Sequence, residues 1–444
     1  MRTALSTQMN QMKVSDSGKV RPPMLTVIAP ADGRVIETIP TDDPDQVRAI
    51  VDRLRDNGAL WRSLGVVGRI HWLTSFRNWL LDNRDELVAL LELETGKSES
   101  ESEAEFALAL EALEHYRAHG AAFLGGRHPQ VAVRPTASMQ VALANQLCSV
   151  MGVVGPWTYP LALAVFDAVP ALLAGAAVVV KPSSETPLTM RAVTAGWASI
   201  GAPMVFETVA GHDAGPAVLD SVDYVRFTGS ADTGKVVALR AAGRLIPCCL
   251  DIGGKSAAVV LADADLDQAA ACIALGGLAN SGQSCNCVER IYVESAVHDA
   301  FIDKLVHEAA AFGPMTDDDP GIGVMTSAAQ VGIVRDQVRD ALLKGARLLC
   351  GGTATGHVFE PTVLADVDPA MSIMTRQTLG PVLPVVRVAD AGEAFELALR
   401  PPAAPCVSVW TTDAAVGARA VGRFAPALVG VNDISGHIAR PTPF

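Results

Sequence analysis

From residue 150 to residue 250 the sequence alternates between short runs of β-branched residues and longer helix-like runs. Bounded β-branched runs predict strands, and the segments between them are long enough for helices. The expected strands are 150–155, 177–181, 205–209, 224–228 and 245–250, and the expected helices are 161–174, 188–200, 214–219 and 233–242. Apolar strands separated by helices are typical of a parallel sheet covered on both faces. The sequence therefore predicts an α/β fold with a doubly wound, nucleotide-binding sheet.

A second alternation begins near residue 252 and predicts a second α/β domain. Its expected strands are 257–261, 290–293, 346–350, 384–388, 405–410 and 428–432, and its expected helices are 266–279, 297–312, 328–344 and 412–423. Before residue 150 we expect strands at 25–28 and 35–39 and helices at 43–60, 69–91 and 107–123. We interpret the acidic run 98–103 as a solvated helix start, and residues 131–148 as an edge hairpin that suits an oligomer contact.

The apolar run 161–180 is about as long as a bilayer span. Asp167, Pro170 and Gly175 interrupt it, so we interpret it as a buried helix followed by a buried strand and predict no membrane partner. The first 23 residues are polar and lack the apolar region of a signal peptide. Eight scattered cysteines show no zinc spacing. We therefore expect no metal site, and free thiols in a reducing cytoplasm.

The net charge of −13 over 444 residues argues against nucleic acid as a partner. An anionic ligand must then be held by local groups, such as a helix N-terminus or a single lysine. Lys181 ends one expected strand of the first sheet, and ligands of open α/β sheets bind at such strand ends. Taken alone, a solvated lysine before a turn is the favoured interpretation of this residue.

The segment 227–234 follows an expected strand and opens an expected helix. Gly229 and Gly234 let the chain turn tightly, and Ser230 can donate at the helix N-terminus, where a pyrophosphate would fit. An ordinary strand-to-helix turn explains the same residues. Asp251 stands beside two glycines at the junction of the two domains. It can be a general base facing a cleft, or a capping aspartate at a hinge.

Cys285 lies in a short polar loop, residues 280–287, between an expected helix and an expected strand. A thiol on such a loop can be exposed and polarised, as a nucleophile requires. A small core residue is the alternative interpretation of any single cysteine.

Taken together, these segments resemble the aldehyde dehydrogenase superfamily over roughly residues 25–444. The matching stretches are residues 152–160, 170–175, 180–182, 227–230, 253–255, 282–285 and 379–382. The segment 289–293 is similar to bacterial NADP-dependent succinate-semialdehyde dehydrogenases. The resemblance implies a dinucleotide-binding domain at 24–130 and 149–251, an oligomerisation hairpin (a small β flap) at 131–148, a catalytic domain at 252–431 and a shortened C-terminal segment at 432–444.

The resemblance implies NAD(P)-dependent oxidation of an aldehyde to an acid through a cysteine thiohemiacetal and a thioester. Cys285 falls on the family nucleophile. Cofactor positions fall on Trp157, Lys181, Ser184, Gly229, Ser230, Thr233 and Gln377. Many NAD-preferring members carry a glutamate where this chain has Ser184. Without that charge a 2′-phosphate is not repelled, so either NADP or NAD is expected.

Several positions depart from the family pattern. Thr158 replaces the asparagine of the oxyanion hole, and losing such a donor costs about 10²–10³ in rate. Asp251 replaces the glutamate general base and is shorter by one methylene. Gln377 replaces a glutamate that holds the nicotinamide ribose, and Leu379 replaces a phenylalanine.

These departures leave two alternatives open: a catalytically impaired protein with a binding or structural role, and an acylating or reductive variant. The partner expected in every catalytic case is a small-molecule aldehyde, whose identity the sequence does not reveal. Relatives continue beyond the position of Phe444, the last residue here, through a strand that pairs across subunits. A homodimer is the expected assembly, with its usual contact in question.

Overall fold

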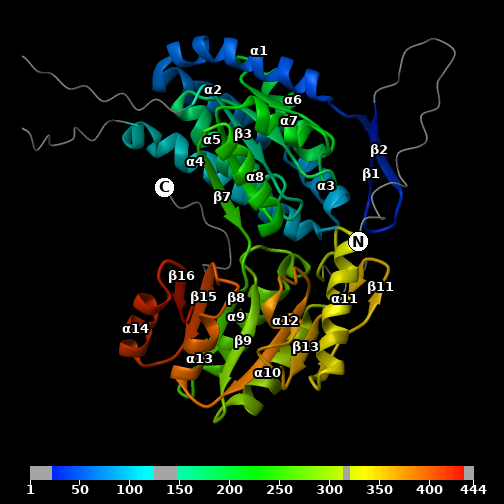
Figure 1. The fold of residues 1–444 in the computed structure, drawn as a ribbon, viewed down its shortest axis with the longest axis vertical. Helices are drawn as coiled ribbons and strands as arrows, with labels where there is room; N and C mark the ends of the chain where they lie inside the picture. The colour runs from blue at the N-terminus through cyan, green and yellow to red at the C-terminus, as the bar shows by residue number, and fades with distance from the viewer. Residues whose placement is uncertain (1–22, 125–147, 314–320, 435–444) are drawn as a thin grey trace, which may run out of the picture.

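The computed structural model describes residues 23–124, 148–313 and 321–434. The hairpin expected at 131–148 and most of the segment 432–444 lie outside the described residues. Two parallel sheets organise the rest, one above the other in Figure 1. The α/β fold class expected from the sequence is confirmed. The domain boundaries stay a prediction, which the change of sheet between Ile252 and Ser256 supports.

The first sheet has the order β5-β4-β3-β6-β7 among the described residues, and every neighbouring pair is parallel. Its strands are β3 (Val150–Val154), β4 (Ala177–Lys181), β5 (Phe206–Thr208), β6 (Tyr224–Gly229) and β7 (Cys248–Ile252). Because parallel strands end at one edge, the residues after β3, β4, β6 and β7 gather there. In register, Val154 pairs with Lys181 on one side and with Phe227 on the other. This edge carries most of the expected cofactor residues.

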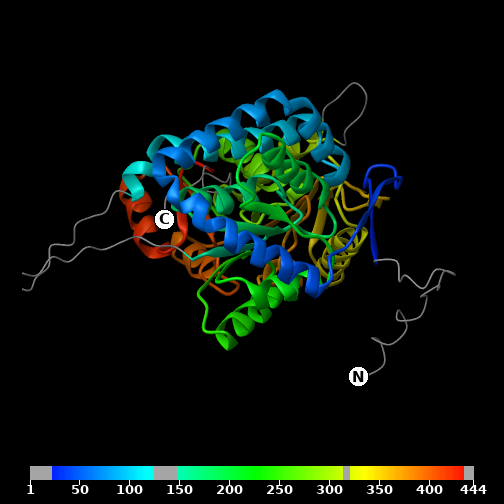
Figure 2. The ribbon, with the colours of Figure 1, turned by 90° about the horizontal axis from the view of Figure 1, so that it is seen from above.

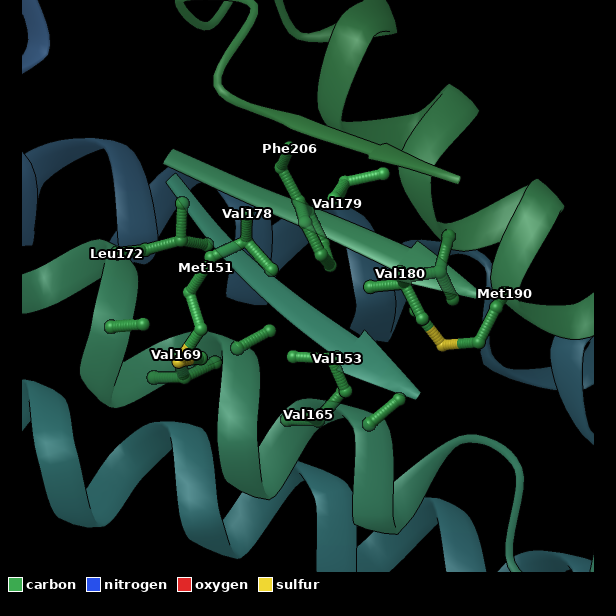
Figure 3. Packing of buried hydrophobic residues seen from close by; sticks show 14 of the residues in the cluster. Met151, Val153, Val165, Val169, Leu172, Val178, Val179, Val180, Met190 and Phe206 are labelled. Carbon is green, nitrogen blue, oxygen red and sulfur yellow. The ribbon is translucent and has the colours of Figure 1, made fainter. Parts of the chain in front are cut away.

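Helices cover both faces of this sheet, as its apolar strands predict. They are α5 (Ala162–Ala174), α6 (Leu188–Ser199), α7 (Ala214–Ser221) and α8 (Ala231–Gly243). Figure 3 shows Met151 and Val153 of β3 packed against Val165 and Val169 of α5. The apolar run 161–180 is thus a buried helix and a buried strand, separated by the left-handed Gly175. Within the described part of the chain, no helix is long and apolar enough to cross a membrane.

The N-terminal segment forms the hairpin β1 (Met24–Ile28) with β2 (Val35–Pro40), followed by four helices (Figure 2). The first of these packs on the first sheet, and the other three pack on helices that cover it. The helices are α1 (Pro44–Ser63), α2 (Gly65–Asp82), α3 (Arg84–Thr95) and α4 (Glu99–Leu124). The single helix expected at 69–91 is wrong, because the chain breaks at Asn83. Its side-chain amide and its backbone N–H both donate to the carbonyl of Trp79, at 2.8 and 3.0 Å. The backbone bond is the ordinary bond of a helical turn, but Asn83 itself leaves the helical conformation, with φ −110° and ψ 20°, while its side chain bonds back to the preceding turn.

The second sheet has the order β10-β13-β14-β9-β8-β15-β16, and within the described residues only the β10–β13 pair is antiparallel. Its strands are β8 (Ser256–Val260), β9 (Val288–Glu294), β10 (Arg347–Cys350), β13 (Thr362–Ala365), β14 (Val382–Val388), β15 (Cys406–Trp410) and β16 (Leu428–Val431). The hairpin β11 (Ala354–Thr355) with β12 (Val358–Phe359) stands apart from it.

The helices of this second part are α9 (Leu266–Leu278), α10 (His298–Ala311), α11 (Ala328–Leu343), α12 (Ser372–Thr375), α13 (Ala391–Ala398) and α14 (Ala414–Phe424), with the 3₁₀ turn η1 (Ala279–Gly282). The strands and helices expected after residue 252 are confirmed to within a few residues. The strand β13, the helix α13 and the short β11, β12 and α12 were not predicted from the sequence. Of these, β11 and β12 pair only with each other, two residues each. In Figure 1, β7 runs from the first sheet down to the junction with the second.

Candidate active site

The loop that carries Cys285 leaves α9 through the turn η1 and enters β9. Asn280 and Ser281 adopt left-handed φ angles of 54° and 53°. Non-glycine residues occupy that region at a cost and persist only where the surroundings hold them. The Asn280 side chain donates to the carbonyls of Thr158 (3.2 Å) and Gln283 (3.0 Å). The loop is therefore fixed both to itself and to the segment that follows β3.

Glu101 of α4 holds the same turn from a third side. Its carboxylate accepts the backbone N–H of Asn280 at 2.6 Å, of Ser98 at 2.9 Å and of Gly323 at 3.2 Å. The interpretation of residues 98–103 as a solvated helix start is right about the helix and wrong about solvation at this position. Glu101 is half-buried and the neighbouring Ser102 is buried. Because the whole run 98–103 is acidic, its composition did not indicate that one of its carboxylates anchors the cysteine loop.

Gly282 is required by close packing in the loop. A Cβ at this position would lie 2.2 Å from the carbonyl oxygen of Gly380, and the φ angle of Gly282 is +66°. Only glycine tolerates both conditions without strain. The approach brings the loop against the segment that contains Gln377 and Leu379.

The Cys285 side chain is half-buried at one end of a pocket. Burial first, and then the nearby charge of Asp251, raise the pKa of the Cys285 thiol to about 12. The thiol is therefore protonated at neutral pH in the free protein. A base or a bound ligand must favour the thiolate before the sulfur can react.

Cys287, two residues further on, has a different environment. It is buried, and its thiol donates to the carbonyl of Gly282 at 3.2 Å and faces Glu289 at 3.7 Å. Burial and Glu289 raise its pKa well above the usual range. A buried thiol held in this way suits a structural residue and not a nucleophile.

Asp251 lies on β7 and faces the junction near Cys285. Although its side chain is exposed at the surface, the surrounding protein partly desolvates it and raises its pKa. The charge of Arg226 opposes that rise. Arg226 of β6 donates to the buried Asp167 of α5 at 2.7 Å and also contacts Cys249. Cross-strand register places Arg226 opposite Cys249 and Thr228 opposite Asp251, so the two charged side chains share one face of the sheet.

Thr158 is buried directly after β3, and its carbonyl accepts the Asn280 amide described above. The Thr158 backbone is therefore held to the cysteine loop by a hydrogen bond from the Asn280 side chain. Trp157, the residue before it, is half-buried on the same edge of the sheet. Both residues lie beside the strand ends that carry the other expected site residues.

Lys181 ends β4 on this edge and is half-buried. Within the described residues no hydrogen bond or ion pair reaches its ammonium group, and burial lowers its pKa. An unpaired, partly desolvated cation at a strand end fits a ligand that brings hydroxyl or phosphate oxygens. This observation supports the expected cofactor site.

Ser184 lies three residues beyond Lys181, and its hydroxyl is buried without a hydrogen-bond partner. It lines a pocket of about 300 Å³ together with the β1–β2 turn, including Gly33, and with Ser327 at the start of α11. Neither Lys181 nor Ser230 lines that pocket. The Ser184 hydroxyl therefore has no hydrogen-bond partner, and the structure does not place it in one pocket with Lys181 and Ser230.

The turn after β6 has the expected form. Ser230 caps α8: its hydroxyl accepts the backbone N–H of Thr233 at 3.3 Å and donates to the Thr233 hydroxyl at 3.0 Å. A Cβ on Gly229 would lie 2.7 Å from the ring of Phe227, so this turn needs a glycine. Ser230 and Thr233 are exposed at a helix N-terminus, which favours an anionic group.

Gln377 approaches the junction from the second sheet. Its side-chain nitrogen lies 2.3 Å from where a Cβ on Gly253 would be, so the amide packs directly on the chain just after Asp251. Its carbonyl accepts a hydrogen bond from Gln337 at 3.0 Å. This placement brings Gln377 close to the nucleophile loop and the proposed base.

A buried polar cluster behind the loop was missed by the sequence analysis. Lys255 contacts Glu289 and Thr378, the latter at 2.9 Å, and Glu289 accepts the backbone N–H groups of Thr378 (2.9 Å) and Leu379 (3.1 Å). The segments 253–255 and 289–293 contain two of these residues, but no pattern in the sequence pairs them. Among the described residues, no group of three or more His, Cys, Asp or Glu residues could hold a metal ion.

A pocket of about 200 Å³ leads to Cys285 between α4, α5 and α9. Leu108, Leu163, Phe166 and Leu275 line its walls. An apolar pocket that ends at a thiol is a suitable site for a small organic substrate.

The aldehyde dehydrogenase family model matches residues 18–444. The chain belongs to the aldehyde dehydrogenase family. It is 32% identical over 424 residues to 4,4′-diapolycopene aldehyde oxidase of Methylomonas sp, covering 94% of this chain and 80% of that protein. It is 33% identical over 420 residues to a provisionally named succinate-semialdehyde dehydrogenase [NADP(+)] 2 of Mycobacterium ulcerans (strain Agy99), covering 93% and 81%.

Among solved structures, the fold is similar to NADP-dependent glyceraldehyde-3-phosphate dehydrogenase from Bacillus halodurans C-125 complexed with NADP. The TM-score is 0.84 at 25% identity, with 92% of this chain and 87% of that chain covered. The resemblance stated from sequence motifs is confirmed, and so is the expected class of enzyme, an NAD(P)-dependent aldehyde dehydrogenase. The roles of individual residues stay predictions.

Proposed function

We propose that Cys285 is the nucleophile with which this enzyme oxidises a small-molecule aldehyde to a carboxylic acid. The observation that supports the proposal is the position of Cys285, which lines a largely apolar pocket and lies within the electrostatic reach of Asp251. The sulfur would add to the aldehyde carbon to form a thiohemiacetal, which is oxidised to a thioester that water hydrolyses. The alternative of a non-catalytic scaffold gains no comparable observation.

Asp251 is the proposed general base. A carboxylate with a raised pKa holds a proton more readily than an exposed aspartate, which suits proton transfer near neutral pH. The thiol proton would pass to solvent before attack, and Asp251 would accept a proton from the water that hydrolyses the thioester. Arg226, anchored by Asp167, limits the rise of the Asp251 pKa and thereby keeps the base available.

Thr158 and the backbone N–H of Cys285 are the proposed donors to the oxygen of the thiohemiacetal. Thr158 is buried and its backbone is joined to the loop by Asn280, so the segment is held in place. A preorganised donor of this kind contributes about 10²–10³ in rate.

The proposed cofactor site uses NAD or NADP and follows the carboxyl edge of the first sheet. Lys181 would bind a ribose hydroxyl or a phosphate, and Ser230 with Thr233 would bind the pyrophosphate at the start of α8, beside Gly229. Gln377 would bond to the nicotinamide ribose, and Trp157 would line the cofactor. When bound, the nicotinamide accepts the hydride of the aldehyde carbon. Ser184, neutral where a glutamate would exclude a 2′-phosphate, leaves NADP acceptable.

The test is an aldehyde panel assayed with both cofactors on three proteins: the wild type, Cys285→Ala and the matched control Cys287→Ala. We expect reduced cofactor from the wild type, a loss of at least about 10⁴-fold in Cys285→Ala, and a change below about tenfold in Cys287→Ala. Equal loss in both variants would mean that the effect is structural. Activity retained by Cys285→Ala would refute the nucleophile assignment.

A further inference from the structure

The pocket that leads to Cys285 is almost entirely apolar along its walls. Its α4 and α5 sides present Leu108, Leu163 and Phe166, and its α9 side presents Leu275 and Ala279. Its volume of about 200 Å³ is below the roughly 300–1,000 Å³ of sites that take drug-sized ligands. The pocket therefore suits a short or narrow carbon chain behind the reacting carbonyl.

Glu101 is the one acidic residue in the lining, and its place is fixed. Its carboxylate accepts three backbone N–H groups, so it cannot swing away from the pocket without breaking the anchor of the cysteine loop. None of the described residues that line the pocket is a lysine, arginine or histidine. A second carboxylate brought in by a substrate would meet a negative charge and no cation.

Lys97 is a cation close behind the pocket wall, but it is already engaged. Its ammonium lies 4.1 Å from the centroid of the Tyr159 ring, and Tyr159 lines the pocket. The same ammonium forms an ion pair with Glu105, and both residues are buried. Glu105 also accepts the backbone N–H groups of Leu161 and Ala162 at the start of α5. The charge of Lys97 is thus balanced and covered by a ring.

We propose that the pocket selects uncharged, apolar aldehydes and rejects aldehydes whose far end carries a carboxylate. This inference rests on the proposed function, because it assigns the pocket to the aldehyde that reacts with Cys285. A carboxylate moved from water to this pocket would lose hydration and find no cation in the described lining, whose polar groups beside Glu101 are the neutral side chains of Tyr159, Asn280 and Ser284. The expected specificity thus differs from the one in the name of the similar succinate-semialdehyde dehydrogenase.

Butanal and succinic semialdehyde form a matched pair for the test, since they share the aldehyde and differ by a methyl group against a carboxylate. We expect kcat/KM of the wild type for butanal to exceed that for succinic semialdehyde by about 10²-fold or more. Comparable values, or a preference for succinic semialdehyde, would overturn the inference and leave the proposed function intact. Oxidation of neither compound nor of longer apolar aldehydes would refute both.

A cation added at the pocket should weaken the discrimination between the two aldehydes. Leu275 is suitable because it lines the pocket while 42% of it is exposed, so a polar replacement can fold. We expect Leu275→Arg to narrow the butanal preference by at least about tenfold, mainly through a lower KM for succinic semialdehyde. Leu275→Gln, polar but neutral, should leave the ratio within about threefold of the wild type. Equal ratios in the two variants would contradict the electrostatic explanation.

Discussion

The carboxyl edge of the first sheet and the cysteine loop of the second meet at one site, but their polar groups are paired in opposite ways. On the edge, the ammonium of Lys181 has no partner among the described residues, and Ser230 is exposed. Behind the loop, Lys255 is fully buried and contacts both Glu289 and Thr378. The ammonium of Lys181 thus has no protein partner among the described residues, whereas that of Lys255 has two.

This difference separates two tasks. A group that binds a diffusible ligand must remain unsatisfied in the free protein, so that the ligand completes its hydrogen bonds. A group that positions a nucleophile must be satisfied within the protein, since loss of about 1 Å in placement costs roughly 10²-fold in rate. The Cys285 loop, held by Glu101 and Asn280, belongs to the second kind.

Replacement of Lys255, the lysine with partners inside the protein, tests this distinction and has the largest expected effect. Lys255→Met leaves the buried Glu289 without its ion pair, which costs about 3–5 kcal/mol of stability in such sites. We expect a large drop in the urea midpoint of unfolding, with loss of activity at temperatures where the wild type is active. The double variant Lys255→Met/Glu289→Gln should recover part of the stability, because no unpaired charge remains. A wild-type midpoint in Lys255→Met would refute the role of the pair.

Much of the fold could be predicted because each buried strand is β-branched and each helix between them is long enough to cover it. The break at Asn83 could not, since it depends on a side chain that bonds to Trp79 only in the folded helix. The short strands β11 and β12 pair two residues each, below the length at which alternation is informative.

The candidate site residues were proposed from the sequence for a different reason: Cys285, Lys181 and Ser230 lie in short motifs of a recognisable family, and their roles stay predictions. The anchor was not, because Glu101 and Asn280 are far apart in the chain and nothing in the acidic run 98–103 indicates that one of its carboxylates bonds to the loop 280–287. Only the folded chain brings an acidic residue of α4 to the backbone of the cysteine loop. Residues that position others carry weaker sequence signals than residues that react.

Replacement of Lys181, the lysine without a protein partner, should affect ligand binding more than stability, the opposite of what we expect for Lys255. Lys181→Met removes a cation that burial already disfavours, so the free energy of unfolding should change by less than about 1 kcal/mol. Cofactor affinity should fall by about tenfold to a hundredfold, because a charge-assisted hydrogen bond is lost. Fluorescence titration with NAD and NADP measures the affinity, and urea unfolding measures the stability. A destabilised variant with unchanged affinity would contradict the proposed division of tasks.

The smallest expected effect concerns the contact between the two regions, where the charge of Asp251 acts on Cys285. Because that charge raises the thiol pKa, Asp251→Asn should lower it and increase the thiolate fraction at a given pH. Alkylation of Cys285 by iodoacetamide, followed by peptide mass spectrometry, should then be several-fold faster than in the wild type, while aldehyde oxidation becomes slower. With a pKa of about 12, the wild-type rate should keep rising about tenfold per pH unit from pH 7 to 10.

Asp232→Asn is the matched control for that experiment, since it removes the same charge from an exposed side chain. It should leave the alkylation rate of Cys285 unchanged. If Asp251→Asn instead slows alkylation, Asp251 must assist removal of the thiol proton more than its charge opposes it. The electrostatic coupling across the junction would then be secondary to proton transfer. A rate that levels off near pH 8 would show that the loop already stabilises the thiolate, and that the cysteine is activated before any ligand binds.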